Sequence, residues 1–142
     1  MAKVNYTFSL NRIELIEKSM YWERVNNDLQ FQFALQIQVV SNSVENESHH
    51  IADIRVLQDK SNDTEIARVK LNCVFHVPDI LQYQNSKTQQ IQLPDEFMLL
   101  LNTVVIGTAR GVMFSEFRGT FLHQTILPVI DPTQLENTKA AV

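Results

Sequence analysis

Residues 93–117 read LPDEFMLLLNTVVIGTARGVMFSEF, and the rest of the chain is best interpreted outward from this apolar stretch. Pro94 suits the first turn of a helix, and the two acidic residues after it interact favourably with the positive helix end. Gly119 follows the stretch and tolerates the left-handed conformation in which many helices end. We therefore predict one long helix from about Pro94 to Phe117.

The predicted helix is apolar around most of its circumference. No charged residue occurs between Glu96 and Arg110, whereas a helix that buries a single face carries polar residues on the other. Its length and its polar interruptions fall short of a bilayer span, which takes about 20 apolar residues. We expect a sheet to cover one side of the helix and a second subunit or a ligand to cover the other.

Two glycines of the helix are candidate contact points. Gly107 and Gly111 are four residues apart on one helix face, and this spacing lets another backbone approach closely. The alternative of equal weight is a tight contact between this helix and the sheet of the same chain. Together with Val104 and Phe114, the two glycines form our candidate oligomer interface.

Four segments before the helix have the alternation of half-buried strands. The clearest is 29–39, in which every second residue is apolar, and 67–77 shows the same period. A third strand begins near Val4 and changes phase at Asn11-Arg12, which indicates a β-bulge. A weaker strand covers 51–57. Short polar links between these segments predict an antiparallel meander.

The fold class predicted from this order is α+β: a four-stranded antiparallel sheet followed by one long apolar helix, with little or no second helix. The 142 residues suit one domain. Within it we expect the sheet over about 4–77, the helix over 94–117 and a C-terminal extension over 118–142.

Composition excludes several classes of protein. The formal charge of −4 and the scattered basic residues make nucleic acid a poor partner. Cys73 is the single cysteine, so neither an internal disulfide nor a cysteine-based zinc site is expected, which suits a reducing cytoplasm. The N-terminus has no uninterrupted apolar run of the secretory type. We expect a cytoplasmic protein that does not insert into membranes.

No catalytic motif is visible in the chain. The four histidines have no metal-ligand spacing, and the three glycines form neither a phosphate-binding loop nor a nucleophile elbow. Cys73 falls on the apolar face of its strand and is expected to be buried and inert. We predict a binding protein rather than an enzyme, with no metal, no cofactor and no catalytic residue.

The run Met20-Tyr21-Trp22 lies between the first two strands. Three large side chains in a row form either a lid on the core or an exposed apolar lip for a partner. The sequence leaves both interpretations open.

Several short motifs, in the order in which they occur, resemble the SecB family of export chaperones. Arg118-Gly119-Thr120-Phe121 is similar to the Arg-Gly-Thr-Phe that follows the long helix of that family, and Leu127-Pro128-Val129 is similar to its downstream Pro-Val element. Ala109-Arg110 resembles an Ala-Arg pair within the helix, and residues 69–77 resemble the fourth strand. The resemblance extends over most of the chain.

Two departures concern the step in which export chaperones deliver clients to the SecA motor. Arg68 stands where the family has an acidic residue, which reverses the charge on the face expected to meet SecA. Ile130-Asp131 replaces the family's Asn-Phe, and the residues after it leave little room for a second helix and tail. SecA is therefore only a candidate partner.

The resemblance implies a homo-oligomer, a dimer of dimers with long helices at subunit contacts, and apolar grooves that hold unfolded or pre-secretory polypeptides. Apolar burial is non-directional and strand edges offer main-chain hydrogen bonds, so many client sequences can bind. We assign client binding to seven residues: Met20, Tyr21, Trp22, Phe97, Leu101, Val105 and Phe121.

Three functions remain as hypotheses. The first is an ATP-independent holdase chaperone, either for preprotein export or for a dedicated client such as a toxin-antitoxin pair. The second is a carrier of a small apolar ligand, held in a cavity between sheet and helix. The third is a structural subunit whose apolar helix serves oligomerisation alone.

Overall fold

Four long strands and one long helix make up most of the part of the protein that the structure describes. The computed structural model describes residues 5–25, 31–58, 64–122 and 137–139. The long elements are β1 (Ser9–Met20), β2 (Phe31–Asn42), β3 (Glu47–Gln58), β4 (Thr64–His76) and α1 (Asp95–Glu116). Two 3-10 turns, η1 (Trp22–Arg24) and η2 (Ile80–Tyr83), and a short strand β5 (Asn137–Lys139) complete the described part.

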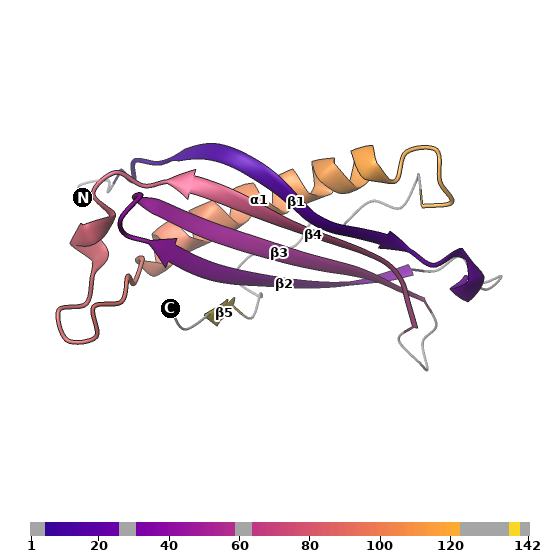
Figure 1. Ribbon diagram of the computed structural model, residues 1–142, viewed down its shortest axis with the longest axis horizontal. Helices are drawn as coiled ribbons and strands as arrows, with labels where there is room; N and C mark the ends of the chain where they lie inside the picture. The colour runs from indigo at the N-terminus through magenta and orange to yellow at the C-terminus, as the bar shows by residue number, and fades with distance from the viewer. Residues whose placement is uncertain (1–4, 26–30, 59–63, 123–136, 140–142) are drawn as a thin grey trace.

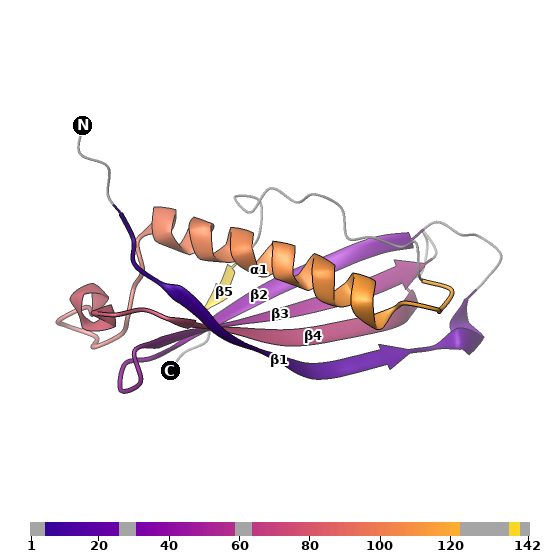
Figure 2. The same ribbon diagram turned by 90° about the horizontal axis from the view of Figure 1, so that it is seen from above.

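The protein has two layers, a twisted sheet and α1 lying across one of its faces (Figures 1 and 2). The strand order is β1-β4-β3-β2-β5. The four long strands are antiparallel to their neighbours, whereas β5 runs parallel to β2. The predicted α+β class, with four antiparallel strands followed by one long helix, is confirmed.

The predicted meander is correct for β2, β3 and β4 but wrong for β1. β1 pairs with β4 at the opposite side of the sheet from β2, so the chain crosses the sheet between Met20 and Phe31. The ten residues between them can reach about 33 Å when extended. Three strand spacings amount to roughly 14 Å. The link is therefore long enough for a crossover and need not form a hairpin.

The bulge predicted at Asn11-Arg12 is present, because the β1–β4 register shifts between Leu10 and Arg12. A second shift, between Leu15 and Glu17, was not predicted. Residues that pair directly across antiparallel strands point to the same face. Three β1 residues are therefore on the helix side of the sheet, opposite Phe75, Cys73 and Leu71: Leu10, Ile13 and Leu15.

One row of α1 side chains packs against the sheet. Its members are spaced four residues apart and have at most 1% of their surface exposed: Phe97, Leu101, Val105, Ala109, Met113 and Phe117. Such a row is inclined to the helix axis by about 26°, so α1 crosses the strands obliquely, as Figure 2 shows. Pro94 precedes α1, and Gly119, at φ 77°, follows it as predicted.

The sheet contributes the other half of the core. In β4 and just beyond it, alternate residues from Ala67 to Val77 are buried on the helix side, as their period predicted. Val74, expected on the wet face, is also fully buried, since it lies on a central strand between Arg12 and His49. The alternation of apolar residues in β4 identified the two faces of the strand. The solvent exposure of its outer face depends on the neighbouring strands β1 and β3.

The expectation that the apolar helix falls short of a membrane span is wrong for α1. Its 22 residues, with a mean hydropathy of 1.6 over the best window, are long and apolar enough to cross a bilayer by length and composition. The inner row of α1 is nevertheless used in packing against the sheet. Burial accounts for this inner row, whereas only 39% of the apolar window is buried and the outer side of α1 keeps exposed apolar residues.

Candidate functional site

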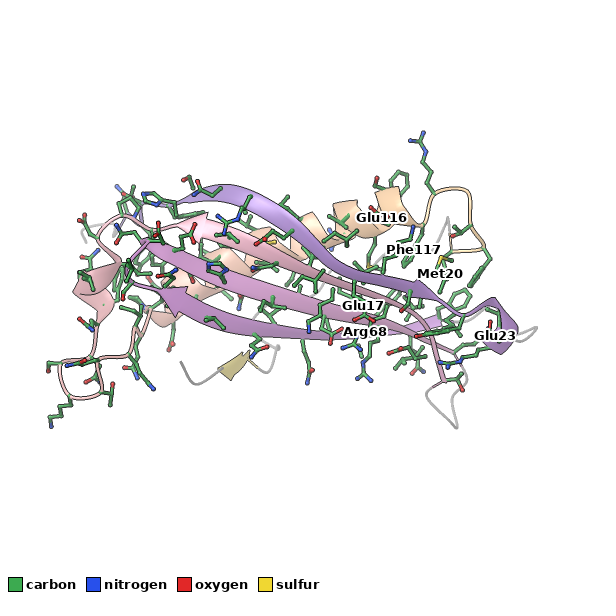
Figure 3. All side chains as sticks on the ribbon, in the orientation of Figure 1. Glu17, Met20, Glu23, Arg68, Glu116 and Phe117 are labelled. Atoms are coloured by element: carbon green, nitrogen blue, oxygen red, sulfur yellow. The ribbon has the colours of Figure 1, made fainter. Side chains whose placement is uncertain are left out.

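The outer face of the sheet, away from α1, is covered by paired charges. Arg68 donates to both carboxylate oxygens of Asp53, with Nε 2.9 Å from Oδ1, and Arg12 donates to Glu47 at 2.9 Å. The guanidinium of Arg68 holds the pKa of Asp53 below its usual value. Arg68, at the position that departs from the SecB pattern, is thus part of an ion pair on a solvated face (Figure 3).

The opposite side of the molecule presents apolar surface. On α1, Leu100 is 40% and Phe114 is 50% exposed, and on the helix side of β1 Ile13 is 47% and Leu15 is 46% exposed. These residues lie outside the row that packs on the sheet. An apolar helix face and an apolar strand edge on the same side of a protein are typical of a binding surface.

The four predicted interface residues belong to this outer side of α1. Gly107 and Gly111 are exposed, and a Cβ added to either would meet nothing within 4 Å. The alternative of a tight contact between these glycines and the sheet is therefore wrong. Val104 is half-buried at the margin of the core, and Phe114 points outward enough to be half exposed.

The assignment of three residues to client binding is corrected, because their side chains are buried. Phe97, Leu101 and Val105 are fully buried in the row against the sheet. Phe97 also stacks on Tyr6, with ring centroids 4.6 Å apart. These three were assigned to the wrong side. The unbroken apolar spacing of four from Phe97 to Phe117 was the signal for the inner row, since Thr103, Gly107 and Gly111 interrupt the other side.

The other predicted client-binding residues gather near the C-terminal end of α1. Met20 ends β1 opposite Ala67 and lies at the same end of the molecule as Phe117 (Figure 3). Met20 and Phe121 are half-buried against the core, and Arg24 lies 3.9 Å over the ring of Tyr21. The side chain of Trp22 lies outside the described part. Met20 packs against the core, as the lid interpretation requires, whereas the exposed lip for a partner stays a prediction.

A salt bridge joins β1 to α1 at this end of the molecule. Lys18 Nζ of β1 lies 3.2 Å from Glu116 Oε2 at the last turn of α1. Phe97 is at the first turn of the helix, and a helix of this length is about 33 Å long. The seven predicted client-binding residues therefore do not form one site.

The edge of the sheet formed by β2 was not predicted as a site. Its helix-side residues form an apolar row that is only partly buried except at Ile37: Phe31, Phe33, Leu35, Ile37 and Val39. A pocket of about 380 Å³ adjoins the end of this row, lined by Val39, Ser41, Ser43, residues 88–93 and Met98. The alternation of 29–39 predicted the strand, but periodicity carries no information on whether a strand is central or at an edge.

A buried polar cluster joins the sheet to the helix beside this pocket. His50 has no exposed surface; its Nε2 lies 2.8 Å from Ser48 Oγ and its Nδ1 lies 3.2 Å from Asn102 Oδ1. Burial lowers the pKa of His50 to about 4. A neutral ring that donates from Nδ1 to Asn102 and accepts at Nε2 from Ser48 satisfies all three groups.

Reactive groups are scarce in the described part of the chain. No three His, Cys, Asp or Glu side chains there come together as a metal site. Cys73 is fully buried, and burial raises the pKa of its thiol to about 11, which removes the thiolate needed for nucleophilic chemistry. The expectation of a buried thiol is confirmed.

The fold of the chain can be compared with those of known proteins. No protein-family model and no curated protein matches the sequence. Among solved structures, the chain is similar to the SecB-like chaperone Rv1957 of Mycobacterium tuberculosis, in complex with a ChAD peptide from the Rv1956 HigA1 antitoxin. The TM-score is 0.60 at 9% sequence identity, over 87% of this chain and 89% of that one. In the part of the chain that the structure describes, the four antiparallel strands and the one long helix are therefore those of the SecB-like fold.

Proposed function

We propose that this protein is an ATP-independent holdase chaperone that binds unfolded polypeptides in the cytoplasm. The observation that carries the proposal is the apolar surface on the outer side of α1 and on β1, which remains after the core is packed and is large enough to be shared between a second subunit and clients. Burial of apolar surface tolerates many sequences. The similar fold of Rv1957, which was solved with an antitoxin peptide, supports a polypeptide as the ligand.

Two finer roles are open to such a holdase. It acts in preprotein export, or it serves a dedicated client such as the antitoxin of a toxin-antitoxin pair. Arg68 stands where the SecB family has an acidic residue, and its ion pair with Asp53 also neutralises that neighbouring carboxylate, so the negative charge expected on a surface that meets SecA is missing here. This favours the dedicated client over delivery to SecA.

We further propose that the chain assembles as a dimer of dimers through the outer side of α1. The contact residues are Val104, Gly107, Gly111 and Phe114, since the two glycines leave room for a second backbone to approach. Clients then contact Met20, Tyr21, Trp22 and Phe121 at the C-terminal end of the helix.

Aggregation suppression measured together with oligomer mass tests the function. The purified protein should slow the aggregation of several chemically unfolded clients without nucleotide, and light scattering should give a mass above that of the 16.4 kDa chain. Assembly without effect on any client would leave only a structural subunit. A monomer that retains a lipid-like molecule in native mass spectrometry would favour the small-ligand carrier. The pocket at β2 gives that alternative little support, because its lining is mainly serine, threonine and glutamine.

A further inference from the structure

A polar cluster on the outer face of the sheet joins three strands. Its members are Arg12 and Glu14 of β1, Glu47 and His49 of β3, and Asn72 of β4. Arg12 Nη1 lies 2.9 Å from Glu47 Oε2, and Arg12 Nε lies 3.5 Å from Glu14 Oε1. The cluster therefore connects the edge strand β1 to strands inside the sheet.

The side-chain amide of Asn72 lies between β1 and β3. Its Nδ2 donates to Glu14 Oε1 at 3.2 Å and to His49 Nδ1 at 3.0 Å. Since Nδ1 accepts, the proton of the neutral His49 ring is on Nε2, which lies 3.1 Å from Glu47 Oε1. The opposite orientation of the amide would set its oxygen against the Glu14 carboxylate. A neutral ring thus keeps Nδ2 directed at Glu14.

One atom of this amide has no hydrogen-bond donor. Asn72 is only 8% exposed, and its Oδ1 is buried without a partner in the part of the chain that the structure describes. A protonated histidine has a hydrogen on Nδ1 as well as on Nε2. If the amide rotated by half a turn, Oδ1 would accept this hydrogen from His49, and Nδ2 would no longer face Glu14.

We infer that His49, Asn72 and Glu14 form a proton-operated switch on the outer face of the sheet. With a neutral ring, Asn72 binds Glu14 and ties β1 to β4. With a protonated ring, Asn72 turns its oxygen to His49 and releases Glu14. The side chain of His49 is 22% exposed, so solvent can deliver the proton. The switch acts on the strand that presents the exposed apolar residues Ile13 and Leu15.

The charges around His49 favour its protonated form. The charged and titratable groups that face it are Glu47 of β3, Arg12 and Glu14 of β1, and Lys70 and His76 of β4. On β2 the residue opposite His49 is Val40, which has no charge. The Arg12 guanidinium holds the pKa of Glu47 below its usual value. Glu47 therefore stays a carboxylate over the range of about pH 5 to 8 in which histidines titrate.

Hydrogen exchange of β1 tests the switch. Exchange of a peptide that covers Ser9–Met20 is followed by mass spectrometry in the purified protein and in His49→Gln, at about pH 8 and about pH 5. The glutamine can accept from Asn72 but cannot be protonated. Comparison at the same pH removes the pH dependence of exchange itself and any effect of His50, which both proteins retain.

The protection of β1 in the unmodified chain, relative to His49→Gln, should fall about two- to tenfold between about pH 8 and about pH 5, as expected for the loss of one hydrogen bond. Glu14→Gln should remove this response and keep β1 protected, because a glutamine amide can pair with either end of the Asn72 amide. The matched control is His76→Gln, on the same face and opposite Glu47, which should retain the full response.

Three results would contradict the switch. The first is an equal change of protection in the unmodified chain and in His49→Gln. The second is a response that disappears in His76→Gln and persists in His49→Gln, which would assign it to the other histidine. The third is an unaltered response in Glu14→Gln, which would exclude the contact with Asn72 as its cause. Since the measurement follows β1 alone, none of these results bears on the holdase function.

Discussion

His50 of β3 and Asn102 of α1 form a polar contact inside the apolar interface between sheet and helix, with Nδ1 3.2 Å from Oδ1. The two residues are 52 positions apart in the chain, and both are buried. The packing of the apolar row of α1 is non-directional and would tolerate a shift of the helix along the sheet, whereas a hydrogen bond has a defined geometry. It fixes the position of the helix along the sheet.

The buried His50 should make stability depend on pH. Its pKa is about 4 in the folded protein and about 6.5 in the unfolded chain. Between these values the unfolded chain binds more protons, so the free energy of unfolding falls as the pH is lowered. We expect a loss of about 2 kcal/mol from pH 7 to pH 5, measured by urea denaturation. His50→Gln should lose most of this slope, and an unchanged slope would assign it to other groups.

Replacing Asn102 should leave a donor of His50 without its partner in the core. Asn102→Leu is expected to lower the free energy of unfolding by about 1–3 kcal/mol, the usual penalty for an unsatisfied buried polar group. Adding His50→Leu should restore part of this loss, because the orphaned ring is then absent. Strictly additive effects in this double-mutant cycle would contradict a coupling between the two residues.

The two sides of α1 should respond differently to truncation. Phe97→Ala removes a fully buried ring and should cost about 3–5 kcal/mol. Phe114→Ala removes a half-exposed ring and should cost less than about 1 kcal/mol at a concentration at which the chain does not self-associate. Equal losses would contradict the assignment of the inner and outer rows. Chemical denaturation of both variants provides the comparison.

Gly107 should matter for assembly and not for folding of the chain. A side chain added at this position meets nothing within 4 Å, so Gly107→Ala should raise the stability of the monomer by about 0.5–1 kcal/mol through helix propensity. Gly107→Leu should also fold, but its larger side chain should prevent a close approach of two helices and lower the mass measured by light scattering. A Gly107→Leu protein of unchanged mass would exclude this helix face from the interface.

The ion pair on the outer face should contribute little to stability. Asp53→Asn and Arg68→Gln, combined in a double-mutant cycle, should give a coupling of about 0.2–1 kcal/mol, because both side chains retain solvent contact. The coupling should shrink in 1 M NaCl, where charges are screened. Client binding should be unaffected by either change, and a loss of binding would bring the outer face of the sheet into the site.

The limits of the sequence are visible in single residues. His49 and His50 precede the predicted strand 51–57, so the prediction assigned neither of them to a face of the sheet. In the structure His49 lies on the outer face beside Glu47, whereas His50 is in the core against Asn102. Likewise, the composition of α1 marked Phe97 and Phe114 as equally apolar, and the position of the sheet made one of them core and the other surface.

The sequence by itself determined the secondary elements and their order: strands with a period of two, one helix bounded by Pro94 and Gly119, and a bulge at Asn11-Arg12. These features depend on backbone preferences and on residues close together in the chain, so they are encoded locally. The tertiary structure alone decided that β1 lies beside β4, that β2 forms an edge occupied by β5, and which side of α1 is buried. Each of these depends on contacts between distant segments, in which apolar burial favours close packing but does not specify the partner.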